Sequence, residues 1–156
     1  MEAKHTTEQI YVDADACPVK DEVVRVAERH GLAVHMVSNA WMRIADSPLI
    51  NRVVVEEGPD VADDWIAAQI GSGDIAVTAD IPLAARCIKA GAKVIGPTGK
   101  PFTESSIGMA LAVRELMADL RETGQVHSTN SAFTRQDRSR FLQALEQAIQ
   151  DVRRAR

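Results

Sequence analysis

Short apolar runs alternate with helical segments over the first 96 residues, and this alternation limits the possible folds more than any other feature. The segments predicted as strands are residues 10–12, 32–37, 52–56, 74–79 and 92–96. The segments predicted as helices are residues 19–30, 61–70 and 81–90, each directly followed by a glycine. Strands that are apolar almost throughout and separated by helices are typical of a parallel sheet covered on both faces. We therefore predict an α/β fold in three layers, with a parallel sheet flanked by helices.

The pattern changes after Gly96, where the segment PTGKPF is rich in turn residues and offers no strand candidate of comparable strength. Two helices are expected to complete the chain. Thr103 can cap the first of them, with Glu104 at its positive end. Thr134 and Asp137 have the spacing of a capping box at the start of the second. The C-terminal part is therefore predicted to add two helices, and no strand, to the α/β core.

The chain of 156 residues suits one domain. We place that domain at residues 10–152, with a flexible segment at 1–9 and a basic tail at 153–156. The first nine residues are polar, and no apolar stretch reaches the roughly 18 residues that a bilayer span requires. Cys17 and Cys87 lie in unlike contexts, so we expect no disulfide framework. These features predict a cytoplasmic protein that is not inserted in a membrane.

Charge is unevenly spread along the chain. The formal net charge of −4 argues against indiscriminate binding of polyanions. From Arg121 onward, however, seven basic residues stand against four acidic ones, so the excess of negative charge lies in residues 1–120. Arginines close to the C-terminus also complement the dipole of a last helix, so their presence alone does not predict a nucleic-acid ligand.

Acidic residues cluster beyond three of the predicted strands. Asp13 and Asp15 follow the first strand, two residues apart, so their side chains share a side in extended geometry. Asp60 and Asp63 are one turn apart at the start of the helix after the third strand, and Asp80 follows the fourth strand. Ligands of open parallel sheets bind at the carboxyl ends of the strands. We therefore expect these five carboxylates to meet in one crevice.

Some of these carboxylates also have a purely structural explanation. Asp60 can be a helix N-cap, with Asp63 and Asp64 enriching the first turn. Asp80 can be another N-cap, since Pro82 stands early in the helix as proline prefers. The pair after the first strand is harder to explain in this way, because two carboxylates at the tip of a buried strand repel each other without a countercharge.

Bound cations would relieve the repulsion among five neighbouring carboxylates. Oxygen ligands without a His or Cys at metal spacing favour Mg²⁺ or Mn²⁺ over Zn²⁺. Such a site suits phosphoryl chemistry, because the metal lowers the pKa of water and neutralises charge on phosphate oxygens. Asp15 is predicted as a catalytic residue in the inner or outer shell. The predicted metal ligands, which are catalytic candidates as well, are Asp13, Asp60, Asp63 and Asp80.

Four motifs make the sequence distinctive: VDADACPVK, GPDVADDWIA, DIAVTADIPLA and, near the C-terminus, FTRQDRSRF. With them, residues 10–149 resemble the YaiI/YqxD family of bacterial proteins of unassigned function. That family is similar in turn to PIN-like and NYN nuclease domains, which cut RNA or DNA with Mg²⁺ or Mn²⁺. The resemblance implies a PIN-like, Rossmann-like fold in which Asp13 closes the first strand and Asp80 follows the fourth. The middle acidic position would be Asp60 or Asp63, whereas family members can have Asn in place of Asp64.

Four further residues are expected to contact a substrate. Asn39 and Arg43 follow the second predicted strand and recur in the family pattern, and an arginine there can hold a phosphate or pair with a nearby aspartate. Thr78 belongs to the VTAD motif after the fourth strand. Arg138 opens the final helix and can grip a nucleic-acid backbone or clamp onto the acidic body. Trp41 can stack on a base or anchor its loop by packing.

The leading hypothesis is a Mg²⁺- or Mn²⁺-dependent nuclease that hydrolyses phosphodiester bonds of RNA or DNA. A second hypothesis is a module that binds nucleic acid or another partner without turnover. A third is a HAD-like phosphohydrolase, since DAD after the first strand imitates a DxD nucleophile and acid pair, although Ala16 and Cys17 do not continue that motif. Cys17 is a poor nucleophile candidate, because Asp13 and Asp15 would raise its pKa and no His is close in sequence.

Overall fold

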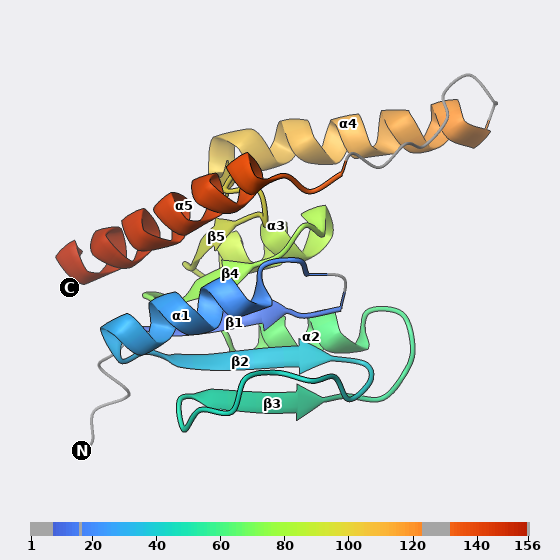
Figure 1. The fold of residues 1–156 in the computed structure, drawn as a ribbon. Coiled ribbons are helices and arrows are strands. Elements are labelled where there is room, and N and C mark those ends of the chain that lie inside the picture. Colours follow the sequence, from blue (N-terminus) through green and yellow to red (C-terminus); the bar gives the residue numbers. More distant parts are fainter. Residues whose placement is uncertain (1–7, 16, 123–131, 156) are drawn as a thin grey trace, which may run out of the picture.

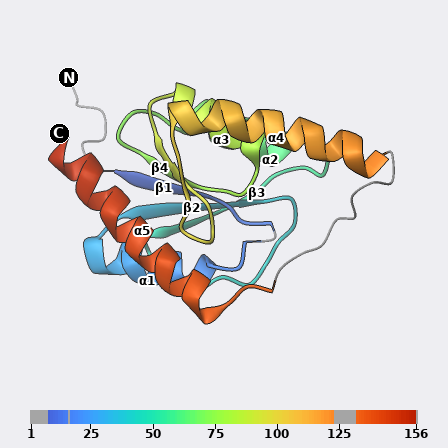
Figure 2. The same cartoon turned by 90° about the horizontal axis from the view of Figure 1, so that it is seen from above.

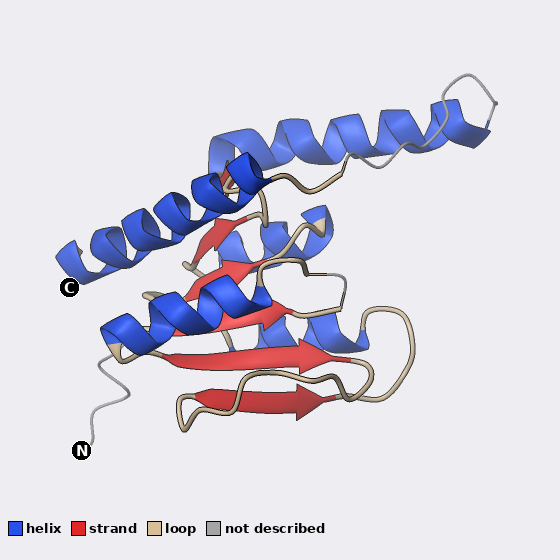
Figure 3. Ribbon diagram, in the orientation of Figure 1, coloured by secondary structure: helices blue, strands red, loops and turns tan. Residues whose placement is uncertain are grey.

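Six strands form one sheet in the order β3-β2-β1-β4-β5-β6, with helices on both sides (Figures 1 and 3). The computed structural model describes residues 8–15, 17–122 and 132–155. The strands are β1 (Gln9–Asp13), β2 (Ala33–Ser38), β3 (Ile50–Val54), β4 (Ile75–Val77), β5 (Lys93–Ile95) and β6 (Pro101–Phe102). The helices are α1 (Lys20–His30), α2 (Val61–Gln69), α3 (Ile81–Lys89), α4 (Glu104–Glu122) and α5 (Arg135–Arg154).

The first five strands run parallel, which confirms the predicted α/β sheet. β6 corrects the prediction that no strand follows Gly96, since it pairs antiparallel with β5 through Val94 and Phe102. Pro101 has no N–H to give to a sheet, and such a residue is tolerated at an edge strand, where one side needs no partner. This strand contains two residues and stands in a turn-rich segment, so periodicity could not reveal it.

Two apolar cores lie on the two faces of the sheet, as expected for three layers. Figure 2 shows α1 and α5 on one face and α2, α3 and α4 on the other. Ile10 and Val12 of β1 pack toward α1 and α5, whereas Tyr11 between them packs toward α2 and α3, because strand side chains alternate between faces. The buried side chains of α5 recur at helical spacing and are Phe141, Leu145, Ala148, Ile149 and Val152.

The connection from β2 to β3 is a loop instead of a helix. Residues 39–49 contain no helix, yet β2 and β3 are parallel and so need a crossover. Ile44 is buried in this loop and Met42 packs beside it, both against the core under α1. These side chains cover the face of the sheet that a crossover helix would cover in an ordinary βαβ unit.

Both C-terminal helices are present and begin at the predicted caps. Thr134 Oγ1 accepts a hydrogen bond from Asp137 N, and Asp137 Oδ2 accepts one from Thr134 N, each over 3.0 Å. Thr103 Oγ1 accepts from Ser106 N over 3.1 Å at the start of α4. None of the helices in the described ranges is long and apolar enough to cross a membrane.

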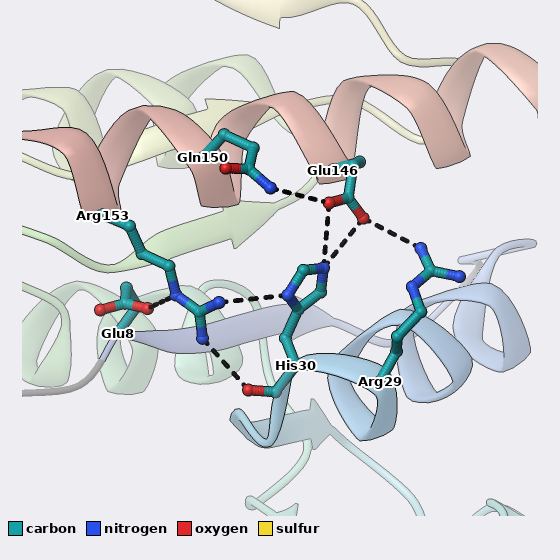
Figure 4. Close-up of polar contacts among 6 residues, drawn as sticks. All are labelled: Glu8, Arg29, His30, Glu146, Gln150 and Arg153. Carbon is teal, nitrogen blue, oxygen red and sulfur yellow. Dashed lines mark hydrogen bonds and ion pairs between the residues drawn. The ribbon is translucent and has the colours of Figure 1, made fainter.

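A polar network fastens α5 to α1 and to the start of β1 (Figure 4). Glu146 accepts hydrogen bonds from Arg29 at 2.9 Å and from His30 Nε2 at 2.9 Å. Arg153 donates to His30 Nδ1 over 3.1 Å and to the buried Glu8 over 2.7 Å. Because a guanidinium only donates, His30 Nδ1 acts as the acceptor and its proton lies on Nε2. The network fixes where α5 crosses the sheet.

The same contacts change the predicted ends of the domain. Glu8 is buried and Gln9 begins β1, so the fold starts before residue 10. Arg153 belongs to α5, which continues to Arg154, so those two residues are helical and not a tail. A buried carboxylate needs a partner, and Glu8 finds one in Arg153, which ties the two ends together. The remainder of the predicted flexible segment and tail, residues 1–7 and 156, lies outside the described residues.

Candidate metal centre

A pocket of about 220 Å³ opens at the carboxyl edge of the sheet. It lies where β1 meets β4, the point at which the strand order reverses and the covering helices change from one face to the other. Ligands of open α/β sheets bind at such a switch point. The lining residues end or follow β1, β4 and β5 and are Asp13, Asp15, Cys17, Val77, Thr78, Ala79, Asp80 and Pro97.

Thr78 joins the ends of β1 and β4. Its Oγ1 donates a hydrogen bond to Asp13 Oδ2 over 2.9 Å and accepts one from Asp80 N over 3.0 Å. Thr78 is buried, and the hydrogen bond to Asp13 uses its single hydroxyl donor. In the structure Thr78 thus orients Asp13, while a contact between Thr78 and a substrate stays a prediction.

Asn39 joins the ends of β2 and β3 to the same pocket. Its backbone N–H donates to Asp15 Oδ2 over 3.0 Å, and its Nδ2 donates to the carbonyl of Glu56 over 3.1 Å. The side chain expected to contact a substrate therefore binds the backbone beyond β3. Asp13 and Asp15 line one pocket, as their spacing predicted.

Asp80 was predicted both as a helix N-cap and as a member of the acidic cluster, and it meets both descriptions. Its Oδ1 accepts a hydrogen bond from Leu83 N over 2.8 Å, which makes it the N-cap of α3, with Pro82 in the first turn. The same carboxyl group lines the pocket. The N-cap explanation is therefore correct, and it leaves Asp80 in the predicted cluster.

Asp60 and Asp63 do not line the pocket that Asp13, Asp15 and Asp80 line. Asp60 is exposed and occupies the N-cap position of α2, as predicted, but its backbone is left-handed with φ of 68° and its side chain makes no capping hydrogen bond. Capping therefore does not account for its carboxylate. Burial raises the pKa of Asp63 to about 6, with further increases from the charges of Asp80, Asp13 and Asp60, in that order. The electrostatic coupling places Asp63 beside the cluster.

Asp13 is also held in an unfavourable electrostatic environment. Burial is the largest cause that raises the pKa of its carboxyl group, and the hydrogen bond from Thr78 opposes that rise. The charges of Asp80 and Asp15 raise this pKa further. Asp13 thus lies among like charges, and a bound cation would reverse the sign of that interaction.

The carboxylate oxygens of the pocket suit a hard cation that keeps part of its water shell better than a cation coordinated by protein atoms alone. In the described part of the chain, no three His, Cys, Asp or Glu side chains lie close enough together to hold a metal ion by themselves. In each of Asp13, Asp15 and Asp80, one oxygen accepts a hydrogen bond from the protein. Mg²⁺ keeps several waters and binds through one or two carboxylates plus substrate phosphates, which suits this arrangement.

Residues 11–151 match the model of the family described as "Uncharacterized BCR, YaiI/YqxD family". The chain belongs to this family. A UPF0178 protein of Parvibaculum lavamentivorans is 62% identical over 146 residues, which cover 94% of this chain and 96% of that protein. A UPF0178 protein of Nitrobacter winogradskyi is 59% identical over 150 residues, which cover 96% of both chains. One of Rhodospirillum rubrum is 60% identical over 149 residues, which cover 95% and 99%.

Two further charged residues within the matched range, Asp64 and Arg43, lie outside the pocket. Asp64 is exposed and forms an ion pair with Arg86 at 2.7 Å, in keeping with its omission from the predicted ligands. Arg43 is exposed on the loop after β2, where its contact with a substrate stays a prediction.

Arg138 acts as an intramolecular clamp. Its Nη1 donates to Glu22 Oε2 over 2.9 Å and to the carbonyl of Pro18 over 3.3 Å. The guanidinium also lies over the ring of Phe133, 4.9 Å from its centroid. Glu22 is buried on α1 and requires a countercharge, so the clamp is the alternative that the structure favours for Arg138.

The pocket also contains residues that the sequence did not indicate as site residues, namely Cys17, Val77, Ala79 and Pro97. Cys17 lines the pocket, but burial raises its pKa, which agrees with its dismissal as a nucleophile. Pro97 was missed, although it follows β5 and so satisfies the rule that selected the residues after β1 and β4. An apolar residue after a strand carries no chemical signal in the sequence that would distinguish a pocket wall from the core.

Proposed function

We propose that this YaiI/YqxD protein is a nuclease that hydrolyses phosphodiester bonds of RNA or DNA with the help of Mg²⁺ or Mn²⁺. The observation that carries the proposal is the position of Asp13. Its carboxylate ends the central strand β1 at the switch point, accepts a hydrogen bond from Thr78, and lies among the charges of Asp80 and Asp15. A rigidly held carboxylate among like charges is the arrangement that a divalent cation stabilises.

Asp13 and Asp80, which both line the pocket, would hold the ion directly, and Asp15 and Asp63 would act through water. Bound Mg²⁺ or Mn²⁺ would lower the pKa of a water molecule and neutralise charge on the phosphate oxygens. The protein's own contribution is geometric: Thr78 orients Asp13, and the backbone of Asn39 orients Asp15. Orienting groups of this kind are as important to a metal site as the ligands themselves.

Two further features support the proposal. The similarity of the YaiI/YqxD family to PIN-like and NYN nucleases, suggested by the motifs around Asp13 and Asp80, agrees with a site at the carboxyl edge of a parallel sheet. Cys17 and Cys87 are both buried and unpaired, a state suited to a reducing compartment, so we propose that the protein acts in the cytoplasm.

The test compares the wild type with Asp13→Asn on labelled single-stranded RNA and DNA, in Mg²⁺, in Mn²⁺ and in EDTA. Asp64→Asn is the matched control, because it makes the same chemical change at an exposed aspartate that pairs with Arg86 outside the pocket. We expect cleavage that requires metal, a loss of about 100-fold or more in Asp13→Asn, and little change in Asp64→Asn. Thermal melting of each variant checks that the fold is retained.

The alternatives give different results in the same experiment. Binding of oligonucleotides without cleavage in any metal would contradict the nuclease and support a module without turnover. Cleavage that persists in EDTA would contradict the metal. A phosphorylated aspartate trapped from a phosphomonoester substrate would indicate a HAD-like phosphohydrolase instead, because metal-assisted attack by water forms no covalent enzyme intermediate.

A further inference from the structure

Trp41 lies on the surface, although tryptophan is among the side chains with most to gain from burial. It is 67% exposed, whereas Trp65 is half-buried beside Tyr11 and His35. A residue that anchors its loop by packing would be covered, so that explanation for Trp41 is wrong. An indole with this exposure presents a large apolar face to solvent.

Arg52 holds the Trp41 ring from one side. The guanidinium carbon lies 5.4 Å from the centroid of the indole, within the range of a cation–π interaction. Nη2 of Arg52 also donates a hydrogen bond to the carbonyl of Ile44 over 2.9 Å, which fixes the guanidinium to the loop that carries Trp41. The indole is therefore supported by a cation, and its exposure leaves room for a second flat group to stack on it.

This surface belongs to the same edge of the sheet as the acidic pocket. Trp41 stands two residues after Asn39, whose backbone N–H binds Asp15 in the pocket. Arg52 and Val54 lie on one side of β3, and Val54 is 50% exposed. We call Trp41, Arg52 and Val54 the stacking patch. Because β3 is two strands away from β1, the patch lies about 10 Å across the sheet from the strand that leads into the pocket.

The charges near the patch decide what kind of ligand it suits. The charged side chains of residues 39–57 are all exposed and comprise two arginines and three acidic residues: Arg43, Arg52, Asp46, Glu56 and Glu57. A surface of this composition does not attract a polyanion by charge alone. A flat aromatic ligand that stacks on an indole needs no such attraction, and every nucleobase has a π face.

We propose that the stacking patch binds an unpaired base of a single-stranded nucleic acid, whose backbone then continues toward the acidic pocket. The inference rests on the proposed function and narrows its substrate to single strands. Bases in a duplex are stacked on each other and cannot offer their faces to Trp41, whereas a single strand can turn one base out onto the ring.

Intrinsic fluorescence gives a direct test, because the chain has two tryptophans and Trp65→Phe leaves Trp41 as the reporter. The Trp65→Phe protein is titrated with oligo(dT), with oligo(U) and with a blunt duplex hairpin, once in EDTA and once with Ca²⁺ in place of Mg²⁺. We expect both single strands to quench Trp41 and the hairpin to leave it almost unchanged. The two single-stranded arms show whether RNA or DNA is preferred.

Affinity of variants with the wild-type Trp65 tests the role of the ring. By fluorescence anisotropy of a labelled oligonucleotide, Trp41→Ala should weaken binding by about 5- to 150-fold, and Trp41→Phe should retain part of the affinity. Met109→Ala is the matched control, since Met109 is 69% exposed on α4, which lies on the opposite side of the molecule from β3 in Figure 1. The ratio between wild type and Trp41→Ala should persist as salt is raised, because stacking does not depend on counterion release.

The outcomes separate this inference from the proposed function. Absence of quenching in both EDTA and Ca²⁺, or equal affinities of wild type and Trp41→Ala, would overturn the stacking patch even if the protein cleaves nucleic acid. Quenching and a loss of affinity in Trp41→Ala, combined with no cleavage in Mg²⁺ or Mn²⁺, would support the patch and contradict the nuclease. A larger response to the hairpin than to the single strands would also overturn the inference.

Discussion

Thr78 Oγ1 donates a hydrogen bond to Asp13 Oδ2 over 2.9 Å, although the two residues are 65 positions apart in the sequence. The bond joins the end of β4 to the end of β1 at the point where the strand order of the sheet reverses. The bond also lowers the pKa of Asp13, whereas burial and the charges of Asp80 and Asp15 raise it. The hydrogen bond from Thr78 therefore favours the ionised form of Asp13, which is the form that binds a cation.

Removing the Thr78 hydroxyl should weaken metal binding. Thr78→Val keeps the shape of the side chain, but it leaves Asp13 without its donor and Asp80 N without its acceptor. We expect the affinity for Mn²⁺, measured by calorimetry, to fall about 10- to 100-fold, as for other residues that orient a ligand. Thr78→Ser retains the hydroxyl and should bind within a few-fold of the wild type. Equal affinities of all three proteins would show that the hydrogen bond does not serve a metal.

Neutralising Asp63 should stabilise the protein in the absence of metal. The folded pKa of about 6 is raised above the usual value, so the stability that this group contributes is full below about pH 4 and is lost as the pH rises through 6. A shift of this size corresponds to about 3 kcal/mol if fully buried, and solvent screening of this partly exposed group reduces the estimate to about 1 kcal/mol.

Urea unfolding in EDTA at neutral pH measures that gain in Asp63→Asn. The gain should vanish when the comparison is repeated below pH 4, where the wild-type carboxyl is protonated as well. Asp64→Asn, one residue away, loses its ion pair with Arg86 and should not gain stability. A destabilised Asp63→Asn protein at neutral pH would contradict the inferred repulsion.

Breaking the clamp between Arg138 and Glu22 should cost stability. Glu22 has a side chain that is 8% exposed, and its Oε1 accepts no hydrogen bond from the described residues. Arg138→Met therefore leaves a buried carboxylate without its countercharge and should lower the free energy of unfolding by about 2 kcal/mol, less than for a fully buried pair because Arg138 is half-exposed.

A second change should repair that loss and decide the role of Arg138. Glu22→Gln combined with Arg138→Met removes both charges, so the double variant should recover most of the wild-type stability. If Arg138 is only a clamp, the double variant should also bind oligonucleotides as tightly as the wild type. A weaker affinity in this stable protein would support the predicted contact between Arg138 and a nucleic-acid backbone.

Glu146 should govern part of the acid sensitivity. Hydrogen bonds from His30, Arg29 and Gln150 lower the pKa of Glu146 to about 2. Its contribution is therefore present above the unfolded value of about 4.5 and is lost as the pH falls through about 2. Because about a third of this side chain is exposed, solvent screening weakens its ion pairs, and Glu146→Gln should cost only about 1 kcal/mol at neutral pH.

Denaturation at neutral pH and near pH 2 tests the sign of this effect. The difference between wild type and Glu146→Gln should shrink at the lower pH, because the wild-type carboxyl is then protonated in the unfolded state and about half protonated in the folded state. Glu28→Gln, at an exposed glutamate of α1, should show little difference at either pH. A difference that grows on acidification would contradict the network shown in Figure 4.

Local patterns in the sequence predicted several elements because each depends on neighbours in the chain. The capping box at Thr134, the N-cap at Asp80 and the alternation along β1 are of this kind. Other features depend on partners that spacing does not reveal. Trp41 is exposed because other side chains of the loop 39–49, Met42 and Ile44, pack against the core in its place. The ion pair between Arg138 and Glu22 forms because α5 packs against α1.

The sequence by itself determined that a parallel α/β sheet forms and that Asp13, Asp15 and Asp80 follow strands, because periodicity and capping are properties of adjacent residues. Only the tertiary structure decided that β1 lies beside β4, so that Thr78 meets Asp13, while Asp60 remains outside the pocket. The physical reason is that the periodicity of the sequence determines only where each strand or helix ends and on which of its faces a side chain lies. The order of the strands then sets which side chain it meets.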